Sequence, residues 1–414
     1  MKRIRTKNLS LLVAVLTLQF LVFACNSAKE ESANQELMIP ELLQRSAKLQ
    51  IGNEWQEVQN QYAAYKQKIE KEDETLPKLM MAELFVKEAR ITGEHGHYYP
   101  AALMMTESAI SSSKTSPELM LQALIIKSGV QMSLHQFEQA SKTAAAAYAL
   151  NPSNAQLLGV LVDANVELGH YDAAVKFADQ MVSIRPDLRS YARVAYLREI
   201  FGDVEGSEQA MMMAVKAGYP GLEETSWAMH TLGEMFIRYG KADKAIDIFN
   251  AILEQRKDYP FAVDGLGQAY EQMGDLEKAE SYYKEAISIL PEVSFNINLA
   301  KLYKKTNRER EAIALAKDIV VMLTEDEKSG HVMDLAYADV YLNVLENEKD
   351  ALHYAQKEYT ARPENIEVNK VMADIYMHMD NPDQLKMHAE IASRTDSKDP
   401  EILMLKEKAD LVIM

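Results

Sequence analysis

Two histidines stand close together in a glycine-flanked segment, and their spacing suggests metal chemistry. His95 and His97 lie on either side of Gly96 within residues 93–100, a segment that also holds Glu94 and two tyrosines. Imidazole and carboxylate groups are ligands for zinc or nickel. The pattern therefore makes His95 and His97 a candidate metal site. The alternative is a long turn between two helices over residues 93–100, with its aromatic side chains packed beneath it.

The only cysteine, Cys25, comes at the end of an apolar run near the amino terminus. Basic residues precede this run, which covers residues 9–24, is short for a membrane span and has the layout of a secretory signal. Residues 22–25, Val-Phe-Ala-Cys, resemble the lipobox of bacterial lipoproteins, in which the signal is cut before the cysteine and the thiol is lipidated. The resemblance implies a signal peptide at 1–24 and a lipidated Cys25. The alternative is an uncleaved signal anchor with an incidental cysteine.

The segment 25–39 is polar and has no apolar periodicity, so we predict a flexible tether. Lys29-Glu30-Glu31 in this tether resembles the short signal that sends some lipoproteins of the Bacteroidetes type to the cell surface. No aspartate follows Cys25, which in the same family argues against retention at an inner membrane. The expected location of the exported protein is therefore the outer membrane, at its periplasmic face or at the cell surface.

The other polar residues form no recognisable catalytic motif. The sequence has no glycine-rich phosphate loop, no Gly-x-Ser-x-Gly elbow and no His-Glu-x-x-His pair. We therefore expect no enzyme activity and no cofactor. The formal net charge is −17, and removal of residues 1–24, which carry four basic and no acidic side chains, leaves −21. A chain this acidic repels phosphate backbones, which argues against nucleic acid as a partner.

The elements that must position these residues repeat at a fixed interval. Phe137 recurs as Tyr171, and Ala140 recurs as Ala174, each after 34 residues. Further pairs at the same offset are Leu232 and Leu266, Phe236 and Tyr270, Gly240 and Gly274, Ala245 and Ala279, and Phe249 and Tyr283. A fixed period of this length indicates one supersecondary unit stacked many times.

Residues 262–291 carry the fullest copy of the unit, and their order resembles a tetratricopeptide repeat. The copy contains Leu266-Gly267, Tyr270, Gly274-Asp275, Ala279, Tyr283, Ala286 and Pro291. The resemblance implies an all-α fold, a right-handed superhelix (α-solenoid) of about eight helical hairpins. We expect the repeat array at 77–399, N-terminal capping helices at 40–76 and a C-terminal capping helix at 400–414, because an uncapped end would expose an apolar face.

The spacing within the copy explains how each unit folds. Leu266, Tyr270 and Met273 fall on one stripe of a first helix, and Gly274 permits the left-handed conformation of a tight exit. A small residue recurs in each second helix where two helices are expected to touch: Ala102, Ala140, Ala174, Ser207, Ala245, Ala279, Ala312 and Ala351, with Leu385 in the last copy. Extra residues between copies, including 218–221 and 324–328, are predicted to form longer loops.

The first helices of this family line an inner, concave wall, at which extended peptides or partner helices bind. Counting from the turns at Gly240 and Gly274, two adjacent first helices are expected to present to this wall Trp227, His230, Glu234, Phe261, Asp264, Gln268 and Glu271. Aromatic side chains anchor partners, and the three carboxylates offer sites for lysine or arginine. The predicted partner is a protein or peptide of basic and apolar character, for example in an outer-membrane complex. The alternative is that these side chains merely solvate a groove.

The leading hypothesis is a non-enzymatic, lipid-anchored adaptor that binds protein partners at the outer membrane or cell surface. The first alternative is a glycan- or nutrient-capture lipoprotein that works with an outer-membrane transporter. The second is a metal-handling lipoprotein that uses His95 and His97.

Overall fold

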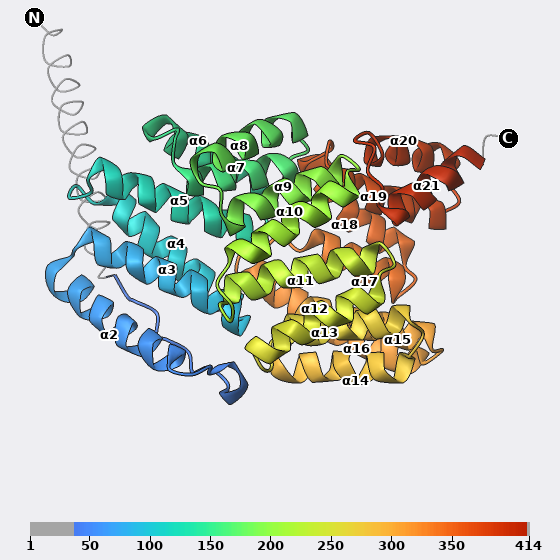
Figure 1. The fold of residues 1–414 in the computed structure, drawn as a ribbon, viewed down its shortest axis with the longest axis horizontal. Coiled ribbons are helices and arrows are strands. Elements are labelled where there is room, and N and C mark those ends of the chain that lie inside the picture. Colours follow the sequence, from blue (N-terminus) through green and yellow to red (C-terminus); the bar gives the residue numbers. More distant parts are fainter. Residues whose placement is uncertain (1–36, 412–414) are drawn as a thin grey trace, which may run out of the picture. The chain divides into compact units, whose positions relative to one another are not determined.

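The computed structural model describes residues 37–411, in which twenty α-helices follow one short 3-10 helix, η1 (Ala47–Leu49) (Figure 1). No strand occurs between residues 37 and 411. The chain divides into two units at Leu42. The first unit contributes only residues 37–42 to the described chain, without regular secondary structure, and the second unit holds all the helices. The all-α prediction is confirmed.

Nine helical hairpins follow one another along the second unit, where about eight were expected. The pairs are α3 (Thr75–Thr92) with α4 (His95–Ser111), α5 (Pro117–Ser133) with α6 (Phe137–Leu150), α7 (Ala155–Glu167) with α8 (Tyr171–Ile184), α9 (Leu188–Ile200) with α10 (Val204–Ala217), α11 (Glu223–Arg238) with α12 (Ala242–Gln255), α13 (Pro260–Gln272) with α14 (Leu276–Ile289), α15 (Val293–Lys305) with α16 (Glu309–Lys328), α17 (Asp334–Asn343) with α18 (Glu348–Ala361), and α19 (Ile366–His378) with α20 (Pro382–Ala392). Stacking of these units buries the apolar faces that a single hairpin would expose.

A residue in the left-handed conformation lies in the turn between the two helices of every hairpin. Glycine takes this position five times, at Gly93, Gly169, Gly202, Gly240 and Gly274. His135, Asn307, Glu346 and Asp380 take it in the other four hairpins, with φ between 51° and 58°. Glycine adopts this conformation without a Cβ clash, so the predicted role of Gly240 and Gly274 is confirmed.

The small residue of each second helix lies where two helices touch, as predicted. Exposure is 3% or less at Ala102, Ala140, Ala174, Ser207, Ala245, Ala279, Ala312, Ala351 and Leu385.

Aromatic rings from the second helices fill the space beside glycines of the first helices. A Cβ on Gly233 or Gly265 would lie 2.5 or 2.4 Å from the Phe249 ring. Both glycines therefore make room for one aromatic side chain of α12.

Two segments expected as long loops or turns are helical instead. Residues 93–100 do not form an extended turn, because α3 ends at Gly93 and α4 already begins at His95. Burial of Tyr98 and Tyr99 stabilises this first part of α4. Residues 324–328 extend α16 to 20 residues, since they contain no glycine or proline and Lys328 pairs with Glu325 three positions earlier. The segment 218–221 lies in a loop, as predicted.

Single α-helices lie at the two ends of the array. Tyr62 of α2 (Glu54–Glu72) contacts Phe85 of α3, and Leu405 of α21 (Pro400–Leu411) joins the apolar core of α19 and α20. The N-terminal end thus has η1 and one α-helix rather than several. Residues 412–414 and the predicted signal peptide lie outside the described residues. No helix within 37–411 is long and apolar enough to cross a membrane.

The first helices are the more closely spaced helices of the array. Each contacts the first helix of the next hairpin, in an unbroken series from α3 to α19, and no comparable contact joins successive second helices from α4 to α20. An array curves around its more closely spaced helices, so α3, α5, α7, α9, α11, α13, α15, α17 and α19 line its inner wall. The candidate residues on α11 and α13 therefore belong to the inner-wall helices.

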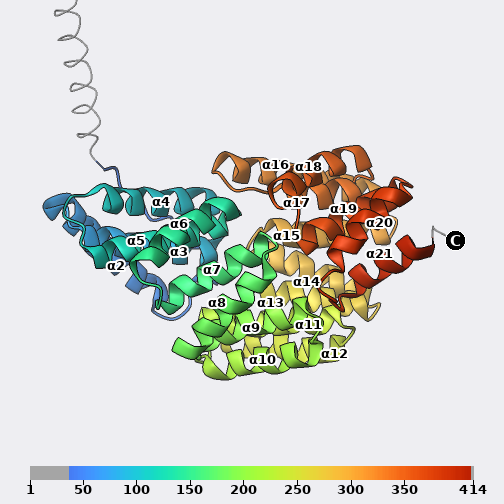
Figure 2. The same cartoon turned by 90° about the horizontal axis from the view of Figure 1, so that it is seen from above.

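The array curves until its N-terminal hairpins meet its C-terminal hairpins. Helix α16 contacts α4 (Figure 2). Hydrogen bonds join residues that lie 195 to 199 positions apart in the sequence. The segments 134–136, 166–171 and 202 meet the segments 330–332, 362–366 and 394–396. We call this line of contacts the seam.

Candidate protein-binding site

Three aromatic side chains on α11 and α13 form the apolar part of the predicted site. The Trp227 ring stacks on His230 at 5.4 Å and meets the edge of Phe261 at 5.4 Å. His230 also meets Phe261, at 5.8 Å. Trp227 is 48% exposed, whereas His230 and Phe261 are half-buried. The cluster therefore offers one accessible indole face that is held in place by its neighbours.

Two carboxylates adjoin this cluster and share one amide. Gln268 Nε2 donates to Glu234 Oε1 at 3.2 Å and to Asp264 Oδ2 at 3.0 Å. Asn298 Nδ2 on α15 donates to Asp264 Oδ2 at 3.0 Å. Asp264 is only 3% exposed, which corrects the expectation that its side chain is presented to a partner. Glu234 remains partly exposed and is the accessible carboxylate of the pair.

Burial governs the ionisation of this group of residues. It raises the pKa of Asp264 to about 7 and, together with the neighbouring Asp264, raises the pKa of Glu234 to about 7. Burial lowers the pKa of His230 to about 4, so the imidazole that lies 3.5 Å from Glu234 is neutral near pH 7. Arg238 lowers the pKa of Glu234 by its positive charge, but less than burial and Asp264 raise it, and neither carboxylate forms an ion pair with a lysine or arginine within residues 37–411. A cationic ligand would therefore favour the ionised carboxylates.

Glu271, the seventh predicted residue, lies in a different environment. Tyr283 Oη donates to its Oε2 at 2.9 Å, and Lys305 Nζ lies 3.0 Å from its Oε1. This carboxylate already has a cationic partner. The structure thus brings together Trp227, His230, Phe261, Glu234, Asp264 and Gln268. Glu271 lies near enough to raise the pKa of Asp264 by its charge, but it is itself paired with Lys305.

Sequence reasoning missed two further residues of this site. Phe295 packs on Phe261 at 5.4 Å, and Asn298 binds Asp264. Each lies 34 residues after its partner, so the repeat period could have identified both. The residue that lies one period after a wall residue occupies the same place in the next repeat and can contact that wall residue.

The two candidate metal ligands face different neighbours. His95 stacks on Tyr99 at 5.2 Å and lies 6.0 Å from the His331 ring, whereas His97 meets the edge of Tyr98 at 4.8 Å. His331 is itself 4.6 Å from His135, and both of its buried ring nitrogens lack a hydrogen-bond partner. No group of three potential metal ligands with suitable geometry occurs within residues 37–411. Cys25, the predicted lipid attachment site, lies outside the part of the chain that the structure describes.

The fold and its inner wall define an α-helical repeat solenoid. Residues 130–189 and 265–293 match tetratricopeptide repeat families. The chain therefore contains tetratricopeptide repeats, within a series of nine stacked helical hairpins. Tetratricopeptide repeats generally bind protein partners and act as scaffolds for protein–protein interaction.

Individual relatives are distant. Human protein O-mannosyl-transferase TMTC1 is 25% identical over 142 residues, which make up 34% of this chain and 16% of that protein. The Cut9–Hcn1 complex of the APC/C is similar in structure, with a TM-score of 0.43 at 14% identity, over 86% of this chain and 74% of the other. The type IV pilus biogenesis factor PilW gives a TM-score of 0.41 at 17% identity, over 50% of this chain and 97% of the other.

Proposed function

We propose that this protein is a non-enzymatic, lipid-anchored adaptor that binds a basic and apolar segment of a protein partner at its inner wall. One observation carries the proposal. An accessible indole, Trp227, stacks on His230 beside Glu234 and Asp264, two carboxylates that form no ion pair with a lysine or arginine within residues 37–411. Most other acidic side chains near the wall are paired, as Glu271 is with Lys305.

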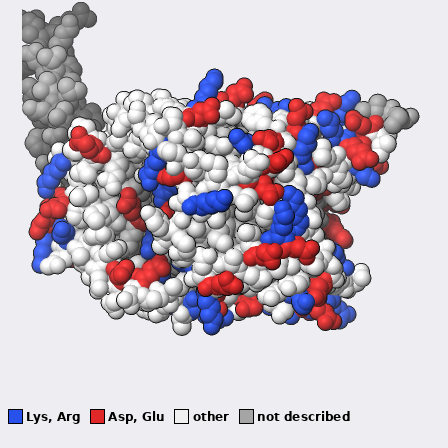
Figure 3. Space-filling model, viewed as in Figure 1, with Lys and Arg blue, Asp and Glu red and all other residues white. Residues whose placement is uncertain are grey.

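The chemistry of this arrangement favours lysine or arginine in the partner. A long basic side chain can lay its methylene stem or its cationic head on an indole face. Its charge would then stabilise the ionised form of Glu234, which burial disfavours. The net charge of −17 would attract a basic partner over longer distances, although on the face seen in Figure 3 acidic and basic side chains are interspersed. An apolar residue beside the basic one would contact Trp227 and Phe261.

Affinity capture from native membranes tests the binding role. Trp227→Ala is expected to lose the captured protein partner, because the aromatic anchor is removed. Tyr219→Ala is the matched control, since Tyr219 is another exposed aromatic residue but lies in the loop between α10 and α11. Equal capture by both variants would contradict the proposed site. Binding of oligosaccharides instead of protein would favour the glycan-capture alternative.

The anchoring part of the proposal rests on the sequence around Cys25 and has its own test. Cys25→Ser is expected to release the folded protein from membranes, because lipidation needs the thiol. Membrane fractionation with mass spectrometry of the mature N-terminus measures this. Retention of the variant in membranes, or a mature chain that still carries residues 1–24, would show that the protein is not anchored in this way.

A further inference from the structure

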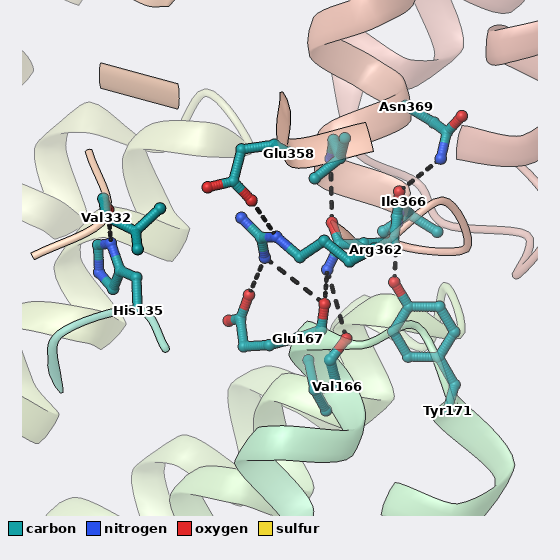
Figure 4. A network of polar contacts seen from close by, with 11 residues as sticks. His135, Val166, Glu167, Tyr171, Val332, Glu358, Arg362, Ile366 and Asn369 are labelled. Atoms are coloured by element: carbon teal, nitrogen blue, oxygen red, sulfur yellow. Dashed lines mark hydrogen bonds and ion pairs between the residues drawn. The ribbon is translucent and has the colours of Figure 1, made fainter. Parts of the chain in front are cut away.

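One arginine connects three segments at the centre of the seam (Figure 4). The buried Arg362 guanidinium donates to Glu167 Oε2 at the end of α7 and to Glu358 Oε2 on α18, both at 2.5 Å. Its Cζ lies 4.6 Å from the Phe137 ring of α6. The ion pair between Arg362 and Glu167 joins hairpins that are 195 residues apart.

Hydrogen bonds to the main chain surround this arginine. Asn365 Nδ2 donates to the Glu167 carbonyl at 2.9 Å, and the Ile366 amide donates to Tyr171 Oη at 2.9 Å. Arg394 Nη2 donates to the Gly169 carbonyl at 2.7 Å. Each of these bonds crosses the seam, and most of them use a main-chain group on one side.

A second group of polar contacts lies further along the seam. The Val332 amide donates to the Leu134 carbonyl at 3.0 Å, and His135 Nδ1 donates to the Val332 carbonyl at 2.9 Å. Gln136 Nε2 donates to the Gly330 carbonyl at 2.8 Å. These three contacts tie the turn between α5 and α6 to the segment between α16 and α17.

Apolar contacts also join the two sides of the seam. At its centre, the buried Ile366 packs with Val166, Tyr171 and Ile200. The seam continues at its N-terminal end between residues 48–91 and 286–295, where the contacts are largely apolar, although Lys48 Nζ also donates to Ser288 Oγ at 3.0 Å. Leu49 and Ile91 share a buried cluster with Leu290 and Phe295.

Water can replace the polar contacts when the seam opens, whereas exposing an apolar cluster has no such compensation. Polar interfaces between parts of one chain commonly permit relative motion. The polar part of the seam, which is held mainly by the hydrogen bonds and ion pairs of residues 134–171 with 330–366, should therefore open before the largely apolar N-terminal end does.

The closed seam also brings C-terminal residues to the ends of inner-wall helices. Arg238, at the end of α11, pairs with Glu199 of α9 and lies 3.9 Å from Asp399, just before α21. The ends of two inner-wall helices are thus linked to the last segment of the array. A partner that extends along the wall past Arg238 would have to displace this link.

We propose that the seam is a reversible latch. Its polar part opens about the apolar contact of Leu49 and Ile91, and a protein partner reaches the inner wall after this opening. That a protein partner binds at the inner wall rests on the proposed function. The opening of the seam does not depend on that function.

Four glycines provide a matched test. Gly169, Gly202, Gly240 and Gly274 all have φ between 72° and 83°, so alanine introduces the same backbone strain at each. A Cβ at Gly169 would lie 2.4 Å from the Glu364 main chain, and one at Gly202 would lie 2.3 Å from the Asp396 carbonyl. A Cβ at Gly240 or Gly274 would have no neighbour within 4 Å. The double variant Gly169→Ala/Gly202→Ala should wedge the seam open, and Gly240→Ala/Gly274→Ala is its control.

Hydrogen exchange of the Val332 and Ile366 amides measures the opening, because both amides donate across the seam. We expect exchange about tenfold faster in the seam variant than in the control. Arg394→Met, which removes a seam contact without backbone strain, should increase the exchange rate by a smaller factor. This variant replaces the double variant if the double variant does not fold. Unchanged exchange in the seam variant or, failing that variant, in Arg394→Met would overturn the latch.

Access to the wall is measured separately, through the fluorescence of Trp227 in a Trp55→Phe background. A short synthetic peptide with alternating lysine and leucine is the probe. We expect the peptide to associate faster with the seam variant than with the control. Equal association rates despite an open seam would overturn the gating role and leave the proposed function intact. Failure of the peptide to bind any form would count against the proposed function, while hydrogen exchange would still decide whether the seam opens.

Discussion

At the inner wall, Glu234 and Glu271 are glutamates on adjacent first helices. Their neighbours compensate the negative charge of the two carboxylates to different degrees. Glu271 has Lys305 and Tyr283 as partners, so its charge is already compensated. Glu234 has an amide, a neutral imidazole and a second carboxylate as neighbours, and Arg238 offsets its charge only in part. Its ionised form therefore gains most from a cation that arrives from outside.

The raised pKa of Glu234 predicts a pH-dependent contribution to stability. Folding raises this pKa from 4.5 to about 7, so the folded state binds the proton more tightly than the unfolded state. The resulting stabilisation is fully present below pH 4.5 and is lost as the pH rises through about 7. At pH 8, Glu234→Gln should increase the free energy of unfolding by about 1–3 kcal/mol.

Denaturant unfolding of Glu234→Gln and wild type at pH 5 and pH 8 measures this difference. The variant should gain more at pH 8 than at pH 5. Glu271→Gln is the control and should show no such gain, because it loses the pair with Lys305. A Glu234→Gln variant with the same pH dependence as wild type would show that the carboxylate is not destabilised by burial.

The sequence predicted which residues meet at the wall but not how they pair. Trp227 and Phe261 are 34 residues apart, so the period alone places them side by side. The burial of Asp264 depends on amides of Gln268 and Asn298, which only the packing of three helices brings together. The contact of His95 with His331 joins residues more than two hundred positions apart, and no local pattern signals it.

At the scale of the helices, glycines contribute to packing because they leave space for side chains of neighbouring helices. Gly233 leaves space for the Phe249 ring, with its Cβ position 2.5 Å from ring atoms, whereas Gly129 in α5 has no neighbour within 4 Å. Alanine favours a helix over glycine by about 1 kcal/mol at either position. Gly129→Ala should therefore raise the melting temperature, and Gly233→Ala should lower it by overpacking worth about 1–3 kcal/mol. Equal shifts would show that Gly233 is not a packing position.

The buried alanine column permits a second test at this scale. Ala279 is fully buried, and Ala279→Leu should destabilise the protein by about 1–3 kcal/mol, because the helices of its hairpin cannot move apart freely. Ala145→Leu in α6 is the control, since Ala145 is exposed and leucine is nearly as good a helix former. Thermal unfolding followed by circular dichroism compares the two. An unchanged melting temperature for Ala279→Leu would mean that the repeat register is wrong.

The repeat period predicts this register correctly. Local composition gave a wrong prediction of secondary structure in two segments. Residues 324–328 looked like a charged loop, yet without a helix breaker they continue α16. Residues 95–100 looked like a turn because glycine and proline occur there, yet burial of Tyr98 and Tyr99 makes them helical. Tertiary packing overrides local propensity in such segments.

At the scale of the whole array, the curvature of the stacked hairpins brings the N-terminal and C-terminal hairpins together at the seam. The close spacing of the first helices turns the repeats until Glu167 meets Arg362. The 34-residue period predicts the repeat and the inner wall, but it carries no sign of the seam. Small rotations between hairpins add up over the array. Their sum is not visible in the pattern of any single repeat.

Calorimetry of the lysine–leucine peptide tests the central claim most directly. Titrations near pH 7, in two buffers with different ionisation enthalpies, measure the protons released on binding. We predict that binding releases protons, because the cation lowers the raised pKa values of Glu234 and Asp264. Glu234→Gln should bind about tenfold more weakly, a loss of about 1.4 kcal/mol, and should release fewer protons, whereas Glu271→Gln should match wild type. Binding without proton release, and with equal affinity in both variants, would contradict the claim that this wall binds a basic partner through Glu234.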